Sequence, residues 1–542
     1  MSTSAPSPAP SRDQADNRWR VLAVLCLAVF AINLDTTLVN VTLPTLVREL
    51  QASTSQLQWV VDAYNLAFAA FVLAAGSLSD RFGRKGALTT GLAVFGLGTL
   101  AGSFAGSTGQ LIAARGVMGI GAAIVFPNTL SILSNVFTDR TERAKAIGIW
   151  GATTGMGVAF GPIVGGWLLE HFWWGSAFLA MAPVAAIGIV LVATTVPSSR
   201  DPEAPRLDIA GLVLSTAALA TLVYTIIEAP GRGWSAPATL AGFAIAAVTL
   251  ALFVAWERRV AQPMLDVTLF TNMRFSAASG SVTVAFFALF GFVFMITMYF
   301  QFIHGYSPFS TGLRTLPVAI SMGTASILGT KLAVRIGNKA VVSTGLLMMA
   351  VAFVWISRSS AETPYLETVF QMLVTAGGMG LTSAPATEAI MGVVPKEKAG
   401  IGSAINDATR ELGGTLGVAV IGSVFTSIYV NTITTSQAAA TLPPDVMTRA
   451  KDSVGGALIA AKSLAGSDPA GAQALTRAAN TAFFDGFTIG CMVAAAVALA
   501  GALFAARFLP ARPTETDGHG DGDVLDDLAA EDELLPSVAL AD

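Results

Sequence analysis

Fourteen apolar runs, each about 18 residues or longer, divide this chain along most of its length. They lie near residues 20–43, 57–78, 86–104, 109–133, 144–169, 176–197, 207–228, 237–256, 275–301, 310–334, 340–357, 366–392, 399–430 and 486–508. Charged residues make up only 12% of the chain, about half of their share in a soluble domain. Helices satisfy their own backbone hydrogen bonds in lipid. The sequence therefore predicts an all-α polytopic membrane protein with 14 transmembrane helices.

Basic residues in the loops predict how the chain is oriented. Arg and Lys recur in alternate loops, at residues 81–85, 140–145, 200–206, 258–259, 335–339 and 396–398. Loops rich in these residues stay in the cytoplasm, and an even number of spans places both termini on one side. We therefore expect a multi-pass protein with both termini in the cytoplasm. We also expect it to be a monomer. Its richness in alanine and glycine is typical of bacteria with GC-rich genomes, which indicates the cytoplasmic (inner) membrane and its lipid bilayer.

The two ends of the chain differ from its apolar body. Residues 1–18 are rich in Ser, Pro and Ala, and residues 511–542 hold ten acidic residues against one basic residue. Both compositions are typical of disorder. The acidic tail accounts for the net charge of −4, since the rest of the chain is net positive, and nothing favours binding to nucleic acid.

No cofactor or metal site is indicated. The chain has two cysteines and three histidines, none of them grouped at a metal-ligand spacing. It also lacks the G-x-x-x-x-G-K-[ST] phosphate loop, so ATP-driven chemistry is not predicted. No constellation of nucleophile and base is visible either, and we expect no enzyme.

The longest loop spans residues 431–485. A break at Pro443 and Pro444 separates alanine-rich segments, which predicts an exposed helical hairpin on the outer side of the membrane.

Three short motifs recur in the same order at nearly one offset. Residues 81–85, 142–144 and 119–121 recur at 335–339, 397–399 and 378–380, which are offsets of 254, 255 and 259 residues. Such a repeat is typical of secondary transporters built from two homologous halves. We expect a six-helix bundle over residues 19–198, two inserted linker helices over 199–260, and a second six-helix bundle over 261–510.

A dense group of charges and glycines separates the second and third apolar runs. It reads GSLSDRFGRK, and its key residues are Gly76, Asp80, Arg81, Gly83, Arg84 and Lys85. Gly83 allows a tight turn, and Asp80 can bind a nearby arginine to latch the two halves at the cytoplasmic side. The same charges also serve as plain topology signals. The pattern resembles the signature loop of the major facilitator superfamily. With six plus two plus six helices, the chain resembles the fourteen-helix drug:proton antiporter branch of that superfamily.

Asp35 is a rare charge inside the first span. It lies about 22 Å beyond Arg20, roughly two-thirds of the way across the hydrocarbon core. A carboxylate at that depth costs about 2.5–3.5 kcal/mol or more, so it needs a partner, a proton or a polar cavity. Residues 33–44 resemble a motif of the fourteen-helix branch, with Thr42 in place of alanine. The resemblance implies that Asp35 belongs to a central cavity; the alternative is a helix-bending polar cluster satisfied by neighbouring threonines.

Arg115 lies in the fourth span at a similar depth, about 8 Å from its outer end. Because neither charge is tolerated alone in hydrocarbon, we expect Arg115 and Asp35 to pair. The run from Arg115 to Gly121 resembles the fourth-helix motif of the superfamily, whose arginine is tied to proton coupling. A permanent structural salt bridge is the alternative.

The fifth span is rich in glycine. Its key residues are Gly157, Gly161, Pro162, Gly165 and Gly166, whose spacing favours close helix packing. The run resembles the antiporter motif that marks exporters of the superfamily, which implies outward transport.

Asp407 and Glu411 lie one turn apart in the thirteenth span, on one helix face near mid-membrane. Two carboxylates this close in low dielectric cannot both ionise cheaply, which suits a proton carrier. Arg410 beside them makes an internal ion pair with Asp407 the alternative.

Four further residues are candidates for the substrate cavity: Asn40, Asp62, Tyr64 and Glu388. Asp62 and Tyr64 begin the second span, where an interfacial hydrogen-bonding role is as plausible as substrate contact.

These features together predict a proton-coupled efflux transporter of amphipathic, possibly cationic, compounds, with small molecules and protons as its partners and the proton gradient as its energy source. The alternatives are export of one dedicated metabolite, lipid or siderophore, import, or a membrane scaffold.

Overall fold

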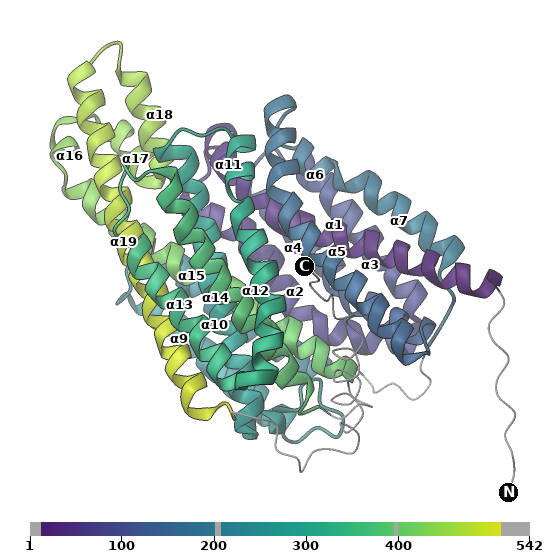
Figure 1. Cartoon of the computed structure of the whole chain (residues 1–542). Helices are drawn as coiled ribbons and strands as arrows, with labels where there is room; N and C mark the ends of the chain where they lie inside the picture. The colour runs from purple at the N-terminus through teal and green to yellow at the C-terminus, as the bar shows by residue number, and fades with distance from the viewer. Residues whose placement is uncertain (1–11, 201–206, 395–398, 511–542) are drawn as a thin grey trace, which may run out of the picture.

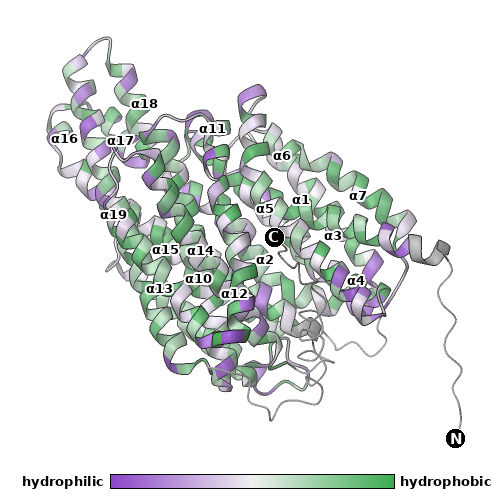
Figure 2. Cartoon of the chain, in the orientation of Figure 1, coloured by the Kyte–Doolittle hydropathy of each residue, from purple (hydrophilic) through white to green (hydrophobic). Residues whose placement is uncertain are grey.

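The computed structural model describes residues 12–200, 207–394 and 399–510, and these residues form helices with no strand among them (Figure 1). The predicted tail at 511–542 and most of the predicted disordered N-terminus lie outside the described residues. Hydrophobic residues predominate along the helices, and hydrophilic residues are more frequent at their ends (Figure 2).

The first half of the protein is a bundle of six helical passes. Its helices are α1 (Arg12–Leu50), α2 (Thr54–Phe82), α3 (Arg84–Ser103), α4 (Thr108–Val136), α5 (Arg140–His171), and the pair α6 (Ser176–Leu179) and α7 (Met181–Thr195). Within it, α1 packs against α5 and α2 packs against α4.

Two inserted helices follow, α8 (Ile209–Arg232) and α9 (Pro237–Glu257). They pack against each other, and α8 also covers α2 and α15. An apolar cluster of Val223, Ile227 and Ala419 holds this contact. The indole of Trp59 in α2 adds a hydrogen bond of 3.3 Å to Glu228 in α8.

The second half repeats the six-pass arrangement. Its elements are the 3₁₀-helix η1 (Val267–Thr271), α10 (Met273–Met298), the π-helical turn η2 (Tyr299–Ile303), α11 (Pro308–Arg314), α12 (Leu316–Ile336), α13 (Asn338–Ile356), α14 (Tyr365–Met391), α15 (Ala399–Thr435), α16 (Gln437–Thr441), α17 (Pro444–Asp452), α18 (Val454–Leu464) and α19 (Pro469–Phe508).

Thirteen helical segments of the described chain are long and apolar enough to cross a membrane. The fourteenth pass is α14, which is more polar but 27 residues long and packed against α10, α12 and α13.

Several helices extend beyond the predicted spans. The last span was expected over 486–508, yet α19 begins at Pro469 and has 40 residues. Asp468 caps its start by accepting a hydrogen bond from the Gly471 amide at 2.9 Å. The helix-start pattern Asp468-Pro469 therefore lies well before the apolar run at residues 486–508 from which the span was predicted.

The predicted hairpin over 431–485 is a set of short helices that pack against other helices of the protein. Helices α16 and α18 contact α19, while α18 also contacts α1 and η2. The Tyr429 hydroxyl donates to the Ala450 carbonyl at 2.8 Å, and Thr54 of the first half donates to the Asp452 carbonyl at 3.2 Å. The segment therefore bridges the two halves instead of standing free.

The bundle has two chemically different ends. We call the end that carries residues 80–85, 138–145 and 335–339 the basic end, and the end that carries α11 and α16–α18 the far end. Among the described residues, the hydrogen bonds that join the halves directly lie toward the far end. Gln301 donates to the Val41 carbonyl at 3.0 Å, and the Phe309 amide donates to Glu170 at 3.2 Å. This conformation holds the halves together at the far end.

Candidate functional site

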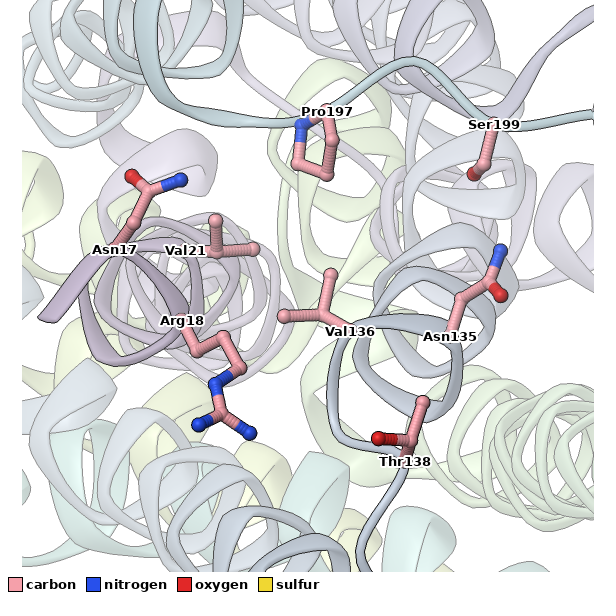
Figure 3. A pocket seen from close by; sticks show the side chains of 8 residues that line it. All are labelled: Asn17, Arg18, Val21, Asn135, Val136, Thr138, Pro197 and Ser199. Atoms are coloured by element: carbon pink, nitrogen blue, oxygen red, sulfur yellow. The ribbon is translucent and has the colours of Figure 1, made fainter. Parts of the chain in front are cut away.

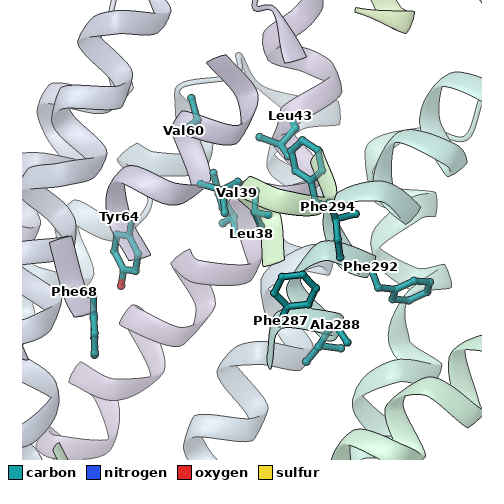
Figure 4. Packing of buried hydrophobic residues seen from close by; sticks show 14 of the residues in the cluster. Leu38, Val39, Leu43, Val60, Tyr64, Phe68, Phe287, Ala288, Phe292 and Phe294 are labelled. Atoms are coloured by element: carbon teal, nitrogen blue, oxygen red, sulfur yellow. The ribbon is translucent and has the colours of Figure 1, made fainter. Parts of the chain in front are cut away.

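A buried ion pair joins α1 to α4. The Arg115 Nη1 atom lies 2.5 Å from Asp35 Oδ2, and both side chains are 0% exposed. The rise per residue of a helix predicts that the two charges lie at the same depth, and in the structure they are in contact. Buried apolar residues of α1, α2 and α10, including Leu38, Val60 and Phe294, belong to one hydrophobic core (Figure 4).

Arg115 is held by two further groups of α2. Its Nε donates to the Val60 carbonyl at 3.0 Å, and its guanidinium lies 4.3 Å from the centre of the Tyr64 ring. By contrast, Asp35 Oδ1 and Arg115 Nη2 have no hydrogen-bond partner among the described residues. The pair is therefore joined by one contact and keeps an unused oxygen, which leaves the carboxylate able to accept a proton.

The threonines next to Asp35 do not satisfy its carboxylate. Thr36 donates to the Ile32 carbonyl at 2.9 Å, and Thr37 donates to the Asn33 carbonyl at 3.3 Å. Hydroxyls bonded to their own helix are not available to Asp35. The structure therefore does not support the alternative in which neighbouring threonines satisfy the Asp35 carboxylate.

Asp62 is fully buried, and neither of its oxygens has a hydrogen-bond partner among the described residues. Its side chain is enclosed by the helix bundle and does not face the surface of the protein. Helix α2 begins at Thr54, so Asp62 lies about 12 Å along it, beneath the contact with α15. Gln58, one turn earlier, donates to the Val418 and Ala419 carbonyls of α15 at 3.1 and 3.0 Å.

Tyr64 is also buried. Besides its contact with Arg115, it lies within electrostatic range of Asp35 and of Glu411 in the second half. Tyr64 therefore packs directly against the ion pair of the first half, a contact that the sequence pattern did not indicate.

Three charged residues occupy one stretch of α15. Asp407 is buried, while Arg410 and Glu411 are partly exposed. The Arg410 guanidinium donates to the Thr387 hydroxyl of α14 at 3.2 Å and lies 5.5 Å from the centre of the Phe286 ring of α10. The ion pair between Arg410 and Asp407 is not formed, since the described residues contain no contact within 4.0 Å between that guanidinium and a carboxylate.

Asn40 and Glu388 stand apart from these charges. The Asn40 amide donates to the Thr36 carbonyl at 3.3 Å, within its own helix. Glu388 is exposed in the last turn of α14, toward the basic end. Neither residue is joined to the ion pair or to the α15 face.

The glycines of α5 allow α1 to approach closely. A Cβ atom at Gly157 would lie 2.9 Å from the Phe30 carbonyl oxygen, and one at Gly161 would lie 2.6 Å from the Leu34 carbonyl oxygen. Toward the far end, Gly166 packs against Pro308 of α11, and the Pro162 carbonyl lies against Gly312. Gly165 continues the contact with Leu38 of α1. The motif thus positions both α1 and the junction between the halves.

Replacing Gly161 with alanine is expected to lower the free energy of unfolding by about 1–3 kcal/mol, because the added methyl group meets helix backbone that must move. Gly155→Ala is the matched control, since a Cβ at Gly155 meets nothing within 4 Å. Thermal unfolding of the detergent-purified proteins measures both. Equal melting temperatures for the two variants would contradict the packing role.

The charged loop at the basic end is shorter than expected, because α2 continues to Phe82 and only Gly83, at φ 113°, interrupts the helix. Asp80 binds Arg84 at 2.6 Å and accepts a bond of 3.4 Å from Ser131 of α4. The remaining contacts also stay in the first half. The Arg84 amide donates to the Ser199 carbonyl at 2.9 Å, and Lys85 donates to the Ala193 carbonyl at 2.8 Å.

Among the described residues, these bonds tie the loop to its own half. The predicted latch between halves is not formed in this conformation, in which the halves are joined at the far end. Gly76 lies inside α2, and Arg81 contacts the neighbouring Phe82 ring.

A cavity of about 460 Å³ opens at the basic end of the first half (Figure 3). Its lining residues are Asn17, Arg18, Val21, Asn135, Val136, Thr138, Pro197 and Ser199. Arg18 is paired with Glu142 at 2.8 Å. None of the predicted site residues lines this cavity, so it is separate from the buried charges. Within the described residues, no group of three or more His, Cys, Asp or Glu side chains is placed to hold a metal ion.

Comparison with known families decides the identity of the fold. The family model of the Major Facilitator Superfamily matches residues 25–418. The chain belongs to this superfamily. The fold is that of a transporter, and two solved transporter structures superpose on most of the chain. A bacterial homologue of the human lysosomal transporter Spinster, in an inward-facing and unoccupied conformation, gives a TM-score of 0.62 at 18% identity over 93% of this chain and 100% of that one. The D-xylose-proton symporter gives 0.58 at 16% identity over 91% and 98%.

Curated relatives of this superfamily member are drug efflux and resistance proteins. The multidrug efflux pump LfrA of Mycolicibacterium smegmatis is 36% identical over 91% of this chain and 97% of its own length. The methyl viologen resistance protein SmvA of Salmonella typhimurium is 32% identical over 86% and 93%. The tetracenomycin C resistance and export protein of Streptomyces glaucescens is 29% identical over 92% and 93%.

Proposed function

We propose that this chain is a proton-coupled antiporter that exports amphipathic, cationic compounds across the cytoplasmic membrane as a monomer. One observation carries the proposal: the buried Asp35–Arg115 pair, whose single contact leaves one carboxylate oxygen unused. A buried ion pair is costly to form and costly to break, so its persistence at this depth favours a functional role. Protonation of Asp35 would cancel one charge and release Arg115.

Several relatives support the direction and the cargo. LfrA is described as a multidrug efflux pump, and SmvA as a methyl viologen resistance protein. Acidic residues inside the bundle suit cationic cargo, because Asp62 and Glu411 each keep a carboxylate oxygen without a hydrogen-bond partner among the described residues. Their negative charge can therefore be balanced by a proton or by a cationic substrate.

The positive-inside rule places the basic end, and with it both termini, in the cytoplasm. The hydrogen bonds that join the halves directly then lie on the outer side, which supports access to the bundle from the cytoplasm in this conformation. Substrate reaches the α15 face from the cytoplasm. Rocking of the halves exposes that face outward, where protons displace the substrate.

The membrane potential adds to this exchange when more positive charge enters as protons than leaves with the substrate, because a one-for-one exchange of a proton for a monocation moves no net charge. Each elementary charge that crosses the bilayer is worth about 2.3 kcal/mol per 100 mV. Proton entry therefore supplies enough free energy for a substrate gradient of tens-fold or more, and no nucleotide is required.

Proteoliposomes test the proposal. With an acidic lumen and an alkaline exterior, protein molecules whose basic end faces outward should concentrate ethidium inside while protons leave. Vesicles without a pH difference and vesicles without protein serve as controls. We expect accumulation only when protein and gradient are both present.

Two other outcomes would overturn the proposal. Accumulation that ignores the pH gradient would exclude proton coupling. Absence of transport for ethidium and a panel of dyes and antibiotics would favour export of one dedicated metabolite, lipid or siderophore.

A further inference from the structure

The segment from η2 to α11 carries direct hydrogen bonds between the two halves. Gln301 of η2 donates to α1, and the Phe309 amide of α11 donates to Glu170 of α5. Gly312 of α11 also packs against the Pro162 carbonyl, and α11 lies at the far end of the bundle (Figure 1). Closure of the far end therefore depends on the shape of this segment.

Two features of the segment are typical of a hinge. Residues 299–303 form a π-helical turn, a rare element that often lies at functional sites. Gly305 follows with a φ of 67°, a conformation that favours glycine. A change of shape at residues 299–305 would move both Gln301 and α11 relative to the first half.

His304 lies between these two features and packs against aromatic rings. Its ring meets the Tyr299 ring edge-on, with 4.6 Å between the centres, and stacks on the Tyr306 ring at 5.3 Å. The Arg314 guanidinium of α11 lies 4.1 Å from the centre of the same Tyr306 ring and 5.3 Å from that of Tyr365 in α14. His304 and Arg314 thus share one aromatic partner.

Arg314 is the charge that acts on His304. Burial, and after it the positive charge of Arg314, hold the pKa of His304 below its usual value. The other titratable groups in contact with the imidazole are the Tyr299 and Tyr306 phenols, which are neutral at physiological pH.

No acid offsets that charge at the imidazole. Among the described residues, no carboxylate lies within 4.0 Å of it. Glu170 of α5 accepts from the Phe309 amide instead, and Glu367 of α14 accepts from the Trp355 indole at 2.9 Å. Helix α19 meets the turn through apolar groups such as the Phe487 ring. A proton on the imidazole would therefore add a second positive charge without gaining a partner.

We propose that His304 is a pH-sensitive switch of the far-end closure, and that its protonation weakens the contact between the halves and favours opening at that end. Neutral imidazole packs on the tyrosines without repulsion, whereas imidazolium repels Arg314. The inference rests on the proposed orientation, in which the far end faces outward. His304 lies outside the membrane-spanning segments, so its proton is separate from the one proposed to bind Asp35.

The direction of the effect follows from linkage. The closed conformation binds this proton less readily than an open one, in which the histidine regains its ordinary pKa of about 6.5. Closure is therefore most stable above that pH and weakens as the pH falls through it.

Distances between spin labels at the far end measure the closure. Gly109→Cys in the first half and Ala361→Cys in the second half provide exposed positions for the labels, whereas the native Cys26 and Cys491 are buried. The full-length protein is measured in detergent from about pH 8 to about pH 5, across the range in which histidine titrates. A wider distance should gain population as the pH falls.

The variant His304→Gln removes the titrating group and stays neutral. Acids elsewhere in the bundle also respond to pH, so the difference between this variant and the wild type isolates His304. At a separation from Arg314 of about 9 Å or less and an effective dielectric constant of about 40, the open to closed ratio should rise about fivefold more in the wild type. His171→Gln is the matched control, because His171 lies at the far end of α5, stacked on Trp167, and it should respond as the wild type does.

A permanent charge provides the converse test. His304→Lys should raise the open to closed ratio about fivefold already at high pH, where the wild type is neutral. Added to Arg314→Gln, the same substitution should change the ratio little, because repulsion requires both charges. All proteins are compared as single folded species at each pH.

Three results would overturn the switch: equal pH responses of the wild type and His304→Gln, an equal loss of response in His171→Gln, or a His304→Lys protein that stays as closed as the wild type at high pH. None of them bears on antiport, which the proteoliposome assay tests separately.

Discussion

Replacing Asp35 with asparagine is expected to abolish proton-driven efflux while the protein still reaches the membrane. Asparagine occupies nearly the same volume and can accept a hydrogen bond from Arg115, so the contact between α1 and α4 persists in weakened form. It cannot bind and release a proton, however, and proton exchange at this position should stop. Dye accumulation in proteoliposomes, together with proton release on substrate addition, measures the loss.

Glu49→Gln is the matched control for this experiment. Glu49 lies on the same helix but is exposed near its far end, away from the ion pair. It should transport at the wild-type rate. Robust efflux driven by the pH gradient in the Asp35→Asn protein would show that proton coupling resides elsewhere, with Asp62 and the α15 acids as the remaining candidates.

Replacing Arg115 with glutamine should have the second large effect, on stability. The change leaves Asp35 buried with no cationic partner, and breaking a buried ion pair from one side costs about 3–5 kcal/mol. It also removes the bond to the Val60 carbonyl and the stacking on Tyr64. We expect a lower melting temperature in detergent and a smaller folded fraction in the membrane.

The double variant Asp35→Asn with Arg115→Gln isolates the charge contribution. Two neutral amides can hydrogen-bond without the cost of an uncompensated charge, so the double variant should melt at a higher temperature than Arg115→Gln alone. It should still fail to transport. If the losses of the two single variants simply add, the two charges are not coupled and the pair has no special energetic role.

Local rules of helix geometry predict some of the site well. Depth along a helix follows directly from residue number, and a charge in hydrocarbon requires a partner, so the contact between Asp35 and Arg115 follows from the sequence. Ser53 and Gln56 form a capping box that starts α2 at Thr54, and such a helix start can be predicted from the sequence. The burial of Asp62 within the bundle depends on how α2 packs and was not predicted.

Other features depend on how helices rotate and pack against one another. The Arg410 side chain could have reached Asp407 on its own helix, but a threonine 23 positions away on α14 binds it instead. The charged loop at Asp80 could have joined the two halves, but contacts with α4 and with the end of α7 keep it in the first half. No pattern in the nearby sequence distinguishes these outcomes.

Sequence alone therefore determined the number of helical passes, the division into two related halves and the pairing of the two deepest opposite charges. These properties follow from hydropathy, helical rise and the cost of a charge in lipid, all of which act along one helix or at one depth. Tertiary structure decided the burial of Tyr64, the partner of Arg410, and the end at which the halves meet. Such choices arise from the simultaneous packing of many side chains from several helices, as the contact of Pro162 and Gly166 with α11 illustrates.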